Sequence, residues 1–264
     1  MTTASPTTPP TADSPVVLRS DDDRIATLTL DSPENRNALS SRLVGELAAH
    51  LCDVEADDAV RAVVLTHTGN TFCAGADLAE GAREGGPAKG VARLVALLRQ
   101  IIELDKPVVA KVDGNVRAGG LGLFAACDIT VAGLTSSFAL TEARLGLSPA
   151  VISLTVLPRL TDRAASRYYL TGDRFDATEA ERIGLVTITA ENPDEVVGEL
   201  AASFRRCSPQ GLAASKQLTT HAMLATFDSD AERLIEMSAT LFSSDDAQEG
   251  IASFMERRPP RWAE

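Results

Sequence analysis

Two glycine-rich turns contain the residues whose types and spacing could support chemistry. The first, TFCAGADL, places Gly75 between the small residues Ala74 and Ala76, which permits a tight turn into a helix start with unpaired backbone N–H groups. The second, DGNVRAGGLGL, places Gly119 and Gly120 before an expected helix. Two such donors on one carbonyl oxygen form an oxyanion hole, in which each contributes about 3 kcal/mol. Either turn alone is also compatible with an ordinary tight turn, so the argument depends on the pair.

Glu142 is the candidate acid or base. It lies in FALTEARLGL among apolar residues, and burial there would raise the pKa of its carboxyl and suit it to proton transfer at carbon. A Glu directly after Thr141 is also typical of a helix N-terminus, where negative charge is stabilised. His50, His67 and His221 show no metal-ligand spacing, and no GxSxG motif supplies a serine nucleophile. The sequence therefore predicts no metal site.

A dinucleotide-binding turn is the rival interpretation of the second glycine cluster. Gly120, Gly122 and Ala125 fit the pattern GxGxxA, and Glu142 follows at about the distance of a ribose-binding acid. That fingerprint needs its first glycine directly after the strand, whereas seven residues separate Val112 from Gly120. We therefore do not expect a nucleotide cofactor bound in that way.

Composition limits the classes of protein that the chain can belong to. Its 264 residues, 44% of them hydrophobic, suffice for one main domain with a small appendage. A net charge of −12 argues against a nucleic-acid surface. Four scattered cysteines without CxxC spacing indicate reduced core residues of a cytoplasmic protein: Cys52, Cys73, Cys127 and Cys207. No signal peptide or membrane span is expected, and residues 1–15, rich in Thr, Pro and Ser, are expected to be disordered.

The hydrophobic pattern predicts an α/β protein with a mainly parallel sheet covered by helices. Strands are expected over 25–30, 62–66, 108–112 and 127–132, with a late strand over 185–188. The first helix should bury one face, formed by Leu43, Val44, Leu47 and Leu51. Further helices are expected over 91–103 and 121–127, and then, in a helical last third, over 196–206, 211–224 and 230–242.

Several motifs stand together in an order and spacing that resemble one family. They are SPENRNAL, FCAGADL, KPVVAKVDG, the AGG turn, AACDI and FALTEARLGLSP. Over residues 16–262 the chain resembles the enoyl-CoA hydratase/isomerase (crotonase) family. The resemblance implies a crotonase-like spiral of repeated β-β-α units over 16–195. It also implies a helical region over 196–264 that assembles a homotrimer or a dimer of trimers.

The same resemblance implies roles for the residues of the two turns. The amides of Ala76 and Gly119 would polarise the C=O of an acyl-CoA thioester and stabilise the enolate, while Glu142 exchanges the α-proton. No separate cofactor is implied, because coenzyme A is part of the substrate. The remaining implied positions are those that approach coenzyme A: the backbone around Asn37, Ala38 and Leu39, the backbone beside Ala74, and Phe254 and Arg257 near the C-terminus. Arg257 is also compatible with a solvated surface charge.

One position departs from the pattern of the ordinary hydratases. They carry a second glutamate where this chain has Gly122, which cannot hold or deprotonate water. AGGLGLFAACDI and TEARLGLSPAVIS resemble a bacterial branch that hydrates branched, glutaconyl-type enoyl-CoAs and also lacks that glutamate. Water could then be oriented by the substrate, by backbone groups, or by Glu80 or Glu84, although both carboxylates are expected to be solvated.

The leading prediction is an enoyl-CoA hydratase acting on a 2-enoyl-CoA. The close alternative is a Δ3,Δ2-enoyl-CoA isomerase, because the family's isomerases rely on a single glutamate at the position of Glu142. A non-catalytic acyl-CoA binding protein is the alternative from another class. Tyr168 and Tyr169 are expected to be packing residues of a helix.

Overall fold

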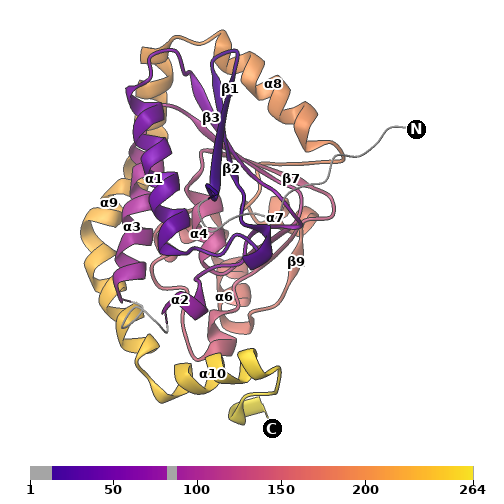
Figure 1. Ribbon diagram of the computed structural model, residues 1–264, viewed down its shortest axis with the longest axis vertical. Coiled ribbons are helices and arrows are strands. Elements are labelled where there is room, and N and C mark those ends of the chain that lie inside the picture. Colours follow the sequence, from indigo (N-terminus) through magenta and orange to yellow (C-terminus); the bar gives the residue numbers. More distant parts are fainter. Residues whose placement is uncertain (1–13, 82–87, 264) are drawn as a thin grey trace.

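Six strands form the larger of two sheets in the computed structural model, which describes residues 14–81 and 88–263 (Figure 1). Their order across the sheet is β1-β2-β3-β5-β7-β10. β1 runs antiparallel to β2 and every other neighbouring pair is parallel, as the alternation of strands and helices predicted. The strands are β1 Val17–Asp22, β2 Ile25–Leu30, β3 Ala62–His67, β5 Val108–Val112, β7 Ile129–Gly133 and β10 Ile188–Ala190.

The late strand was placed three residues too early by the sequence. The amides of Leu185 and Val186 both donate to the carbonyl oxygen of Ala180, at 2.9 and 3.1 Å. Ala180 belongs to helix α7 (Ala177–Arg182), so these apolar residues satisfy the end of that helix before the chain enters β10. Leu185 is buried in the core, as its apolar side chain predicted, but its backbone is not part of the sheet.

A second sheet of four short strands lies beside the first. Its order is β4-β6-β8-β9, formed by β4 Thr71–Cys73, β6 Asn115–Arg117, β8 Ser137–Ala139 and β9 Phe175–Asp176. β4, β6 and β8 each follow a strand of the larger sheet by a few residues, namely β3, β5 and β7. This alternation confirms the spiral of β-β-α units that the resemblance implied. These short strands were not predicted from the sequence, because two or three residues are too few to show an alternating pattern.

Helices cover both faces of the larger sheet (Figure 1). α1 (Ser41–Ala56) begins at Ser40, whose hydroxyl accepts a hydrogen bond from the Leu43 amide, and it buries the predicted apolar face. α3 (Ala88–Glu103) packs beside α1. On the other face α8 (Pro193–Arg205) contributes Ala201 to a small cluster with Ile25, Ala62 and Val64.

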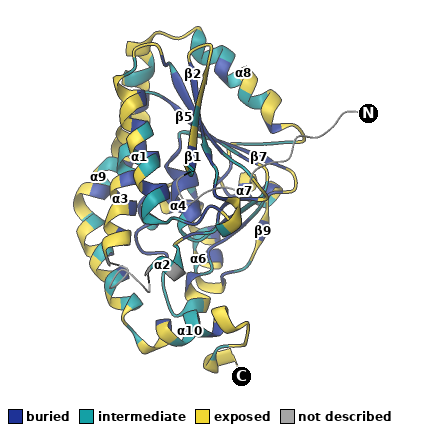
Figure 2. Cartoon of the chain, viewed as in Figure 1, coloured by how far each residue is buried: buried dark blue, intermediate teal, exposed yellow. Residues whose placement is uncertain are grey.

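The buried helix α4 (Gly119–Ala126) begins two residues before the predicted 121 and runs through the centre of the molecule. It is apolar on all sides, and Figure 2 shows its surroundings as the darkest, most buried region. A helix of this kind is stabilised by packing on every face rather than along one stripe. Its first residues therefore have little freedom to move.

The last third is helical, with one correction. The expected helices over 211–224 and 230–242 are one continuous helix, α9 (Pro209–Phe242), because Phe227 in the expected break is buried and α9 packs along α3. Such packing overrides weak local propensity. α10 (Asp245–Glu256) lies in the region expected to be helical, although it was not predicted as a separate helix. No helix among the described residues is long and apolar enough to cross a membrane.

Seven further segments complete the described chain. They are η1 Pro33–Asn35, α2 Leu78–Gly81, η2 Glu142–Leu145, α5 Ser153–Val156, η3 Leu157–Arg159, α6 Asp162–Thr171 and η4 Arg261–Ala263. η2 packs against both α6 and α10, and α5 packs against α4. These contacts assemble the region around Glu142 from parts of the chain far apart in sequence.

Candidate active site

The two glycine turns meet, as the sequence predicted. Gly75 has a φ of +94°, and a Cβ there would lie 2.9 Å from the Cβ of Ala118 and 3.2 Å from the amide nitrogen of Gly119. Only glycine permits this backbone conformation together with so close an approach. Position 75 therefore holds the first turn directly against the start of α4.

The amides at these turns are left free. Ala118, the residue before α4, has a φ of +46°, and its side chain makes no cap. Among the described residues, neither the Ala76 amide nor the Gly119 amide has a hydrogen-bond acceptor. Leu39 holds the first turn in place, since its amide donates to the carbonyl oxygen of Gly75 at 2.8 Å. Two fixed donors without partners suit an anionic oxygen.

Glu142 lies just beyond the strand of the second sheet that contacts the second glycine turn. The Ala118 amide donates to the carbonyl oxygen of Ala139 at the end of β8, at 3.1 Å. Glu142 then begins η2 shortly after Ala139, and Thr141 provides no side-chain cap. The carboxylate is thus positioned by the strand that flanks the second turn.

The Glu142 side chain is buried, and one of its two oxygens has no partner in the described part of the chain. The residue is 9% exposed, and its Oε2 atom has no hydrogen-bond partner among the residues that the structure describes. Burial raises the pKa of this carboxyl from 4.5 to about 7, against a smaller lowering by its own backbone amide. Burying a carboxylate in this way costs free energy of folding, and strongly perturbed carboxyl groups are concentrated at functional sites. Near neutral pH it can both accept and donate a proton.

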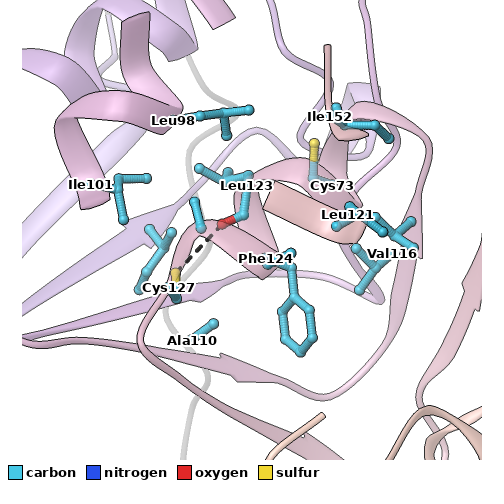
Figure 3. Packing of buried hydrophobic residues seen from close by; sticks show 14 of the residues in the cluster. Cys73, Leu98, Ile101, Ala110, Val116, Leu121, Leu123, Phe124, Cys127 and Ile152 are labelled. Carbon is cyan, nitrogen blue, oxygen red and sulfur yellow. Dashed lines mark hydrogen bonds between the residues drawn. The ribbon is translucent and has the colours of Figure 1, made fainter. Parts of the chain in front are cut away.

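Gly122, the position of the absent second glutamate, faces Ile152. A Cβ at residue 122 would lie 2.4 Å from Cγ2 and 2.8 Å from Cβ of Ile152. Figure 3 shows Ile152 and Cys73 over the same helix, in keeping with the close approach of Gly120 to Cys73. The apolar Ile152 side chain therefore fills the space into which a side chain at residue 122 would have to extend.

The segment expected to contact coenzyme A lies next to the first turn. The buried Asn37 side chain donates to the carbonyl oxygen of Thr71 at 2.8 Å and accepts from the Ser32 amide at 2.7 Å. The Ala74 amide donates to the carbonyl oxygen of Arg36 at 3.1 Å. Asn37, Ala38 and Leu39 thus lie beside Ala74. The Asn37 side chain is occupied by the fold, which leaves only backbone groups of that residue for a ligand.

Phe254 and Arg257 lie apart from this loop, on α10 at the lower end of the molecule (Figure 1). Phe254 is 54% exposed. Arg257 is exposed too and ends the helix in a left-handed conformation, with a φ of +56°. α10 packs on η2, where the main chain of Leu145 closely approaches Gly250. Their role toward coenzyme A stays a prediction.

Tyr168 and Tyr169 differ, although both were expected to be packing residues. The Tyr168 hydroxyl donates to Glu179 at 2.8 Å, and its ring packs on Phe175 with centroids 4.2 Å apart. The half-buried Tyr169 instead places its hydroxyl 3.2 Å from the Ser153 hydroxyl. Burial, and to a lesser extent the charge of Glu142, raises the pKa of Tyr169. Sequence alone signals only that adjacent helical residues face different sides.

The expectations for Glu80 and for two of the cysteines need correction. Glu80 is half-buried rather than solvated, because it accepts hydrogen bonds from the Ser41 amide and hydroxyl at 2.7 and 2.6 Å, at the positive start of α1. Glu84 lies outside the described residues, as do residues 1–13 of the expected tail. Of the four free cysteines expected in the core, two are exposed: Cys52 on the outer side of α1 and Cys207 beyond α8.

Comparison with known proteins establishes the family. Residues 21–264 match the family Enoyl-CoA hydratase/isomerase. A solved structure from Mycobacterium avium paratuberculosis K-10 is 56% identical, with a TM-score of 0.90, and covers 94% of this chain and 99% of its own. An enoyl-CoA hydratase from Mycobacterium avium is 54% identical, with a TM-score of 0.89 and the same coverage. The chain belongs to the enoyl-CoA hydratase/isomerase family, with the crotonase fold.

More distant relatives include isomerases by name. The 1,2-epoxyphenylacetyl-CoA isomerase of Escherichia coli (strain K12) is 30% identical over 247 residues, which are 90% of this chain and 94% of the relative. Shared fold and family thus accompany different reactions. The choice between them has to be argued from the residues around Glu142.

Proposed function

We propose that the protein is an enoyl-CoA hydratase, a hydro-lyase that adds water across the double bond of a 2-enoyl-CoA through an oxyanion-stabilised enolate. The observation that carries the proposal is the buried Glu142 carboxylate, whose Oε2 has no partner among the described residues, at the edge that holds the two free-amide turns. Its similarity to an enoyl-CoA hydratase at 54% identity supports the same reaction.

The amides of Ala76 and Gly119 bind the thioester oxygen in this proposal. As the oxygen of water bonds to Cβ, one water proton passes to the Glu142 carboxylate and the electrons of the double bond move onto the thioester oxygen. The two amides stabilise the resulting enolate. Glu142 then returns its proton to Cα, so that a single carboxylate completes the addition and recovers its starting state.

The rest of the substrate extends from this centre. Backbone groups of Asn37, Ala38 and Leu39 and the backbone beside Ala74 are proposed to hold coenzyme A, and Phe254 and Arg257 to approach it from α10. Branched or glutaconyl-type acyl groups are the proposed substrates. We further propose a cytoplasmic homotrimer or dimer of trimers, assembled through residues 196–264.

A Δ3,Δ2-enoyl-CoA isomerase is the second candidate, and the contact of Gly122 with Ile152 favours it. In that reaction Glu142 removes a proton from C2 and returns it to C4, which requires no water and no second acid. Over residues 14–81 and 88–263, the site has one suitable carboxylate, Glu142, and the apolar Ile152 stands where the second would be. This chemistry uses the same oxyanion hole.

Assays with enoyl-CoA thioesters separate these functions. A hydratase removes the absorbance of 2-enoyl thioesters across short, long and branched chains, with 3-hydroxyacyl-CoA as product. No such loss, together with conversion of a 3-enoyl-CoA into a 2-enoyl-CoA, would establish the isomerase instead. Binding of acyl-CoA without either turnover would identify a non-catalytic binding protein.

A further inference from the structure

Around Gly122, the residues that the structure describes leave hydration without an obvious second group to hold the water. Glu142 provides one acceptor, while Gly122 provides no side chain and Ile152 fills its space with carbon. A water that attacks carbon in a fixed direction needs at least two polar partners to orient it. The identity of the second partner can be inferred from the structure, and this inference rests on the proposed hydration.

Helix α6 brings a hydroxyl group to the Glu142 side of the site. η2 and α6 are joined by Arg144, whose guanidinium donates to the carbonyl oxygen of Thr171 at 2.8 Å and to Asp173 at 2.7 Å. This clamp fixes the end of α6 that bears Tyr169. Ser153, at the start of α5, holds the Tyr169 hydroxyl from the other side, at 3.2 Å.

Glu142 and Tyr169 stand on elements that pack together, since η2 begins at Glu142 and contacts α6, which bears Tyr169. The charge of Glu142 is one of the causes that raise the pKa of Tyr169, after burial. Yet Oε2 of Glu142 has no hydrogen-bond partner among the described residues, and the Tyr169 hydroxyl pairs with Ser153. Two polar groups on packed elements that make no direct hydrogen bond can be bridged by a water.

The hydrogen-bond directions leave Tyr169 able to accept. The Ser153 hydroxyl donates its only proton to the carbonyl oxygen of Pro149 at 2.7 Å. Ser153 therefore accepts from Tyr169, and a phenol oxygen that has donated its proton retains lone pairs. That oxygen can accept one proton of a water whose other proton points at Glu142.

We infer that Tyr169, held by Ser153, positions the attacking water opposite Glu142 and takes the place of the second glutamate. Water donates one hydrogen bond to the Tyr169 oxygen and one to Oε2 of Glu142, which leaves a lone pair free for Cβ. The proton shared with Glu142 moves to the carboxylate and then to Cα. The proton directed at Tyr169 stays on the oxygen and becomes part of the product hydroxyl.

The test compares neighbouring tyrosines on the same helix. Tyr169→Phe should lower kcat for hydration by about 10- to 100-fold, the value of one hydrogen bond to a group that gains charge, with KM nearly unchanged. Tyr168→Phe is the matched control, because its hydroxyl bonds Glu179 rather than the site, and it should hydrate as the wild type does. Ser153→Ala should give a smaller loss of kcat than Tyr169→Phe.

A second readout isolates the water from the proton chemistry. Exchange of the Cα hydrogens of a saturated acyl-CoA in D2O needs Glu142 and the oxyanion hole but no attack at Cβ. Tyr169→Phe should retain wild-type exchange. Wild-type hydration by Tyr169→Phe, equal losses of hydration and exchange, or an equal loss in Tyr168→Phe would each overturn the role of Tyr169. Exchange without hydration by the wild type would overturn the proposed function itself.

Discussion

Lys216 and Glu142 are both buried ionisable side chains, but they differ in how many of their polar atoms have hydrogen-bond partners. Lys216 is 5% exposed and donates to Asp128 at 2.8 Å and to the carbonyl oxygens of Ile101 and Lys106 at 2.8 and 3.1 Å. Glu142 is 9% exposed, and one of its oxygens has no partner among the described residues. Similar burial thus accompanies a Lys216 ammonium group whose three protons are all paired and a Glu142 carboxylate with one oxygen left unpaired by the described residues.

The difference separates what holds the chain together from what is available for a reaction. Lys216 lies on α9 and ties that helix to the end of α3 and to the start of β7, where all three of its protons are used. The Glu142 carboxylate instead has its own backbone amide as a partner and an Oε2 that is unpaired among the described residues, and its raised pKa is a cost to folding. We expect substitutions at the two residues to have opposite effects on stability.

The largest effect on stability is expected at the paired residue. Lys216→Met should lower the free energy of unfolding by about 3–5 kcal/mol, because it leaves Asp128 without its cation in a buried place. Denaturant unfolding measures this loss. Arg233→Met is the control on the same helix, since its ion pair with Asp230 is exposed, and it should change stability by less than about 1 kcal/mol. Equal losses in the two variants would contradict the contrast.

Removing the charge of Glu142 should have the opposite sign. The folded pKa of about 7 lies above the ordinary 4.5, so ionisation costs the folded state nothing below pH 4.5 and progressively more as the pH rises toward 7. Glu142→Gln should therefore be more stable than the wild type by about 3 kcal/mol above pH 7. Near pH 4 the two should be nearly equal. Thermal unfolding from pH 4 to 8 would contradict this if the difference did not grow with pH.

A double-mutant cycle can test whether the Ile152 side chain restricts residue 122. Gly122→Ala should cost about 1–3 kcal/mol by overpacking, since its Cβ would lie 2.4 Å from Ile152. In the Ile152→Ala background the same change should cost less, because the Cγ2 methyl group at 2.4 Å is gone and only the Cβ at 2.8 Å remains. Chemical denaturation of the four proteins gives the coupling energy. Additive costs would show that Ile152 does not restrict residue 122.

The rate should follow the ionisation of Glu142. Hydration begins with a proton moving to the carboxylate, so kcat/KM should rise with pH and level off above about 7, the pKa of Glu142. Below that value the rate should fall about tenfold for each pH unit. Initial rates from pH 5 to 8.5 measure this profile. A profile that stays flat down to pH 5 would place the essential proton elsewhere.

The sequence predicted those parts of the fold whose pattern is local. The apolar residues over 25–30 and 62–66 and the face of α1 show their periodicity directly, and the two turns are marked by glycines that close contact requires. β4, β6 and β8 are too short to show a period. The continuity of α9 depends on packing against α3, which no local window contains.

The candidate site divides in the same way. Glu142 and the turns were predicted, because glycine spacing and an apolar surrounding are visible in the sequence. The contact of Ile152 with Gly122 and the approach of Tyr169 to Ser153 were not, since each joins residues on separate helices. Gly122 alone indicated that a group was absent, but only the structure places Ile152 in its space.

Hydrogen exchange at Cα tests the central claim most directly. A saturated acyl-CoA incubated in D2O should acquire deuterium at Cα with the wild-type protein, because the free amides stabilise the enolate and Glu142 carries the proton. Glu142→Gln should lower the exchange rate by about 10²–10⁴-fold, while it folds normally and still binds the acyl-CoA. Wild-type exchange by Glu142→Gln would contradict the account and remove Glu142 from the chemistry.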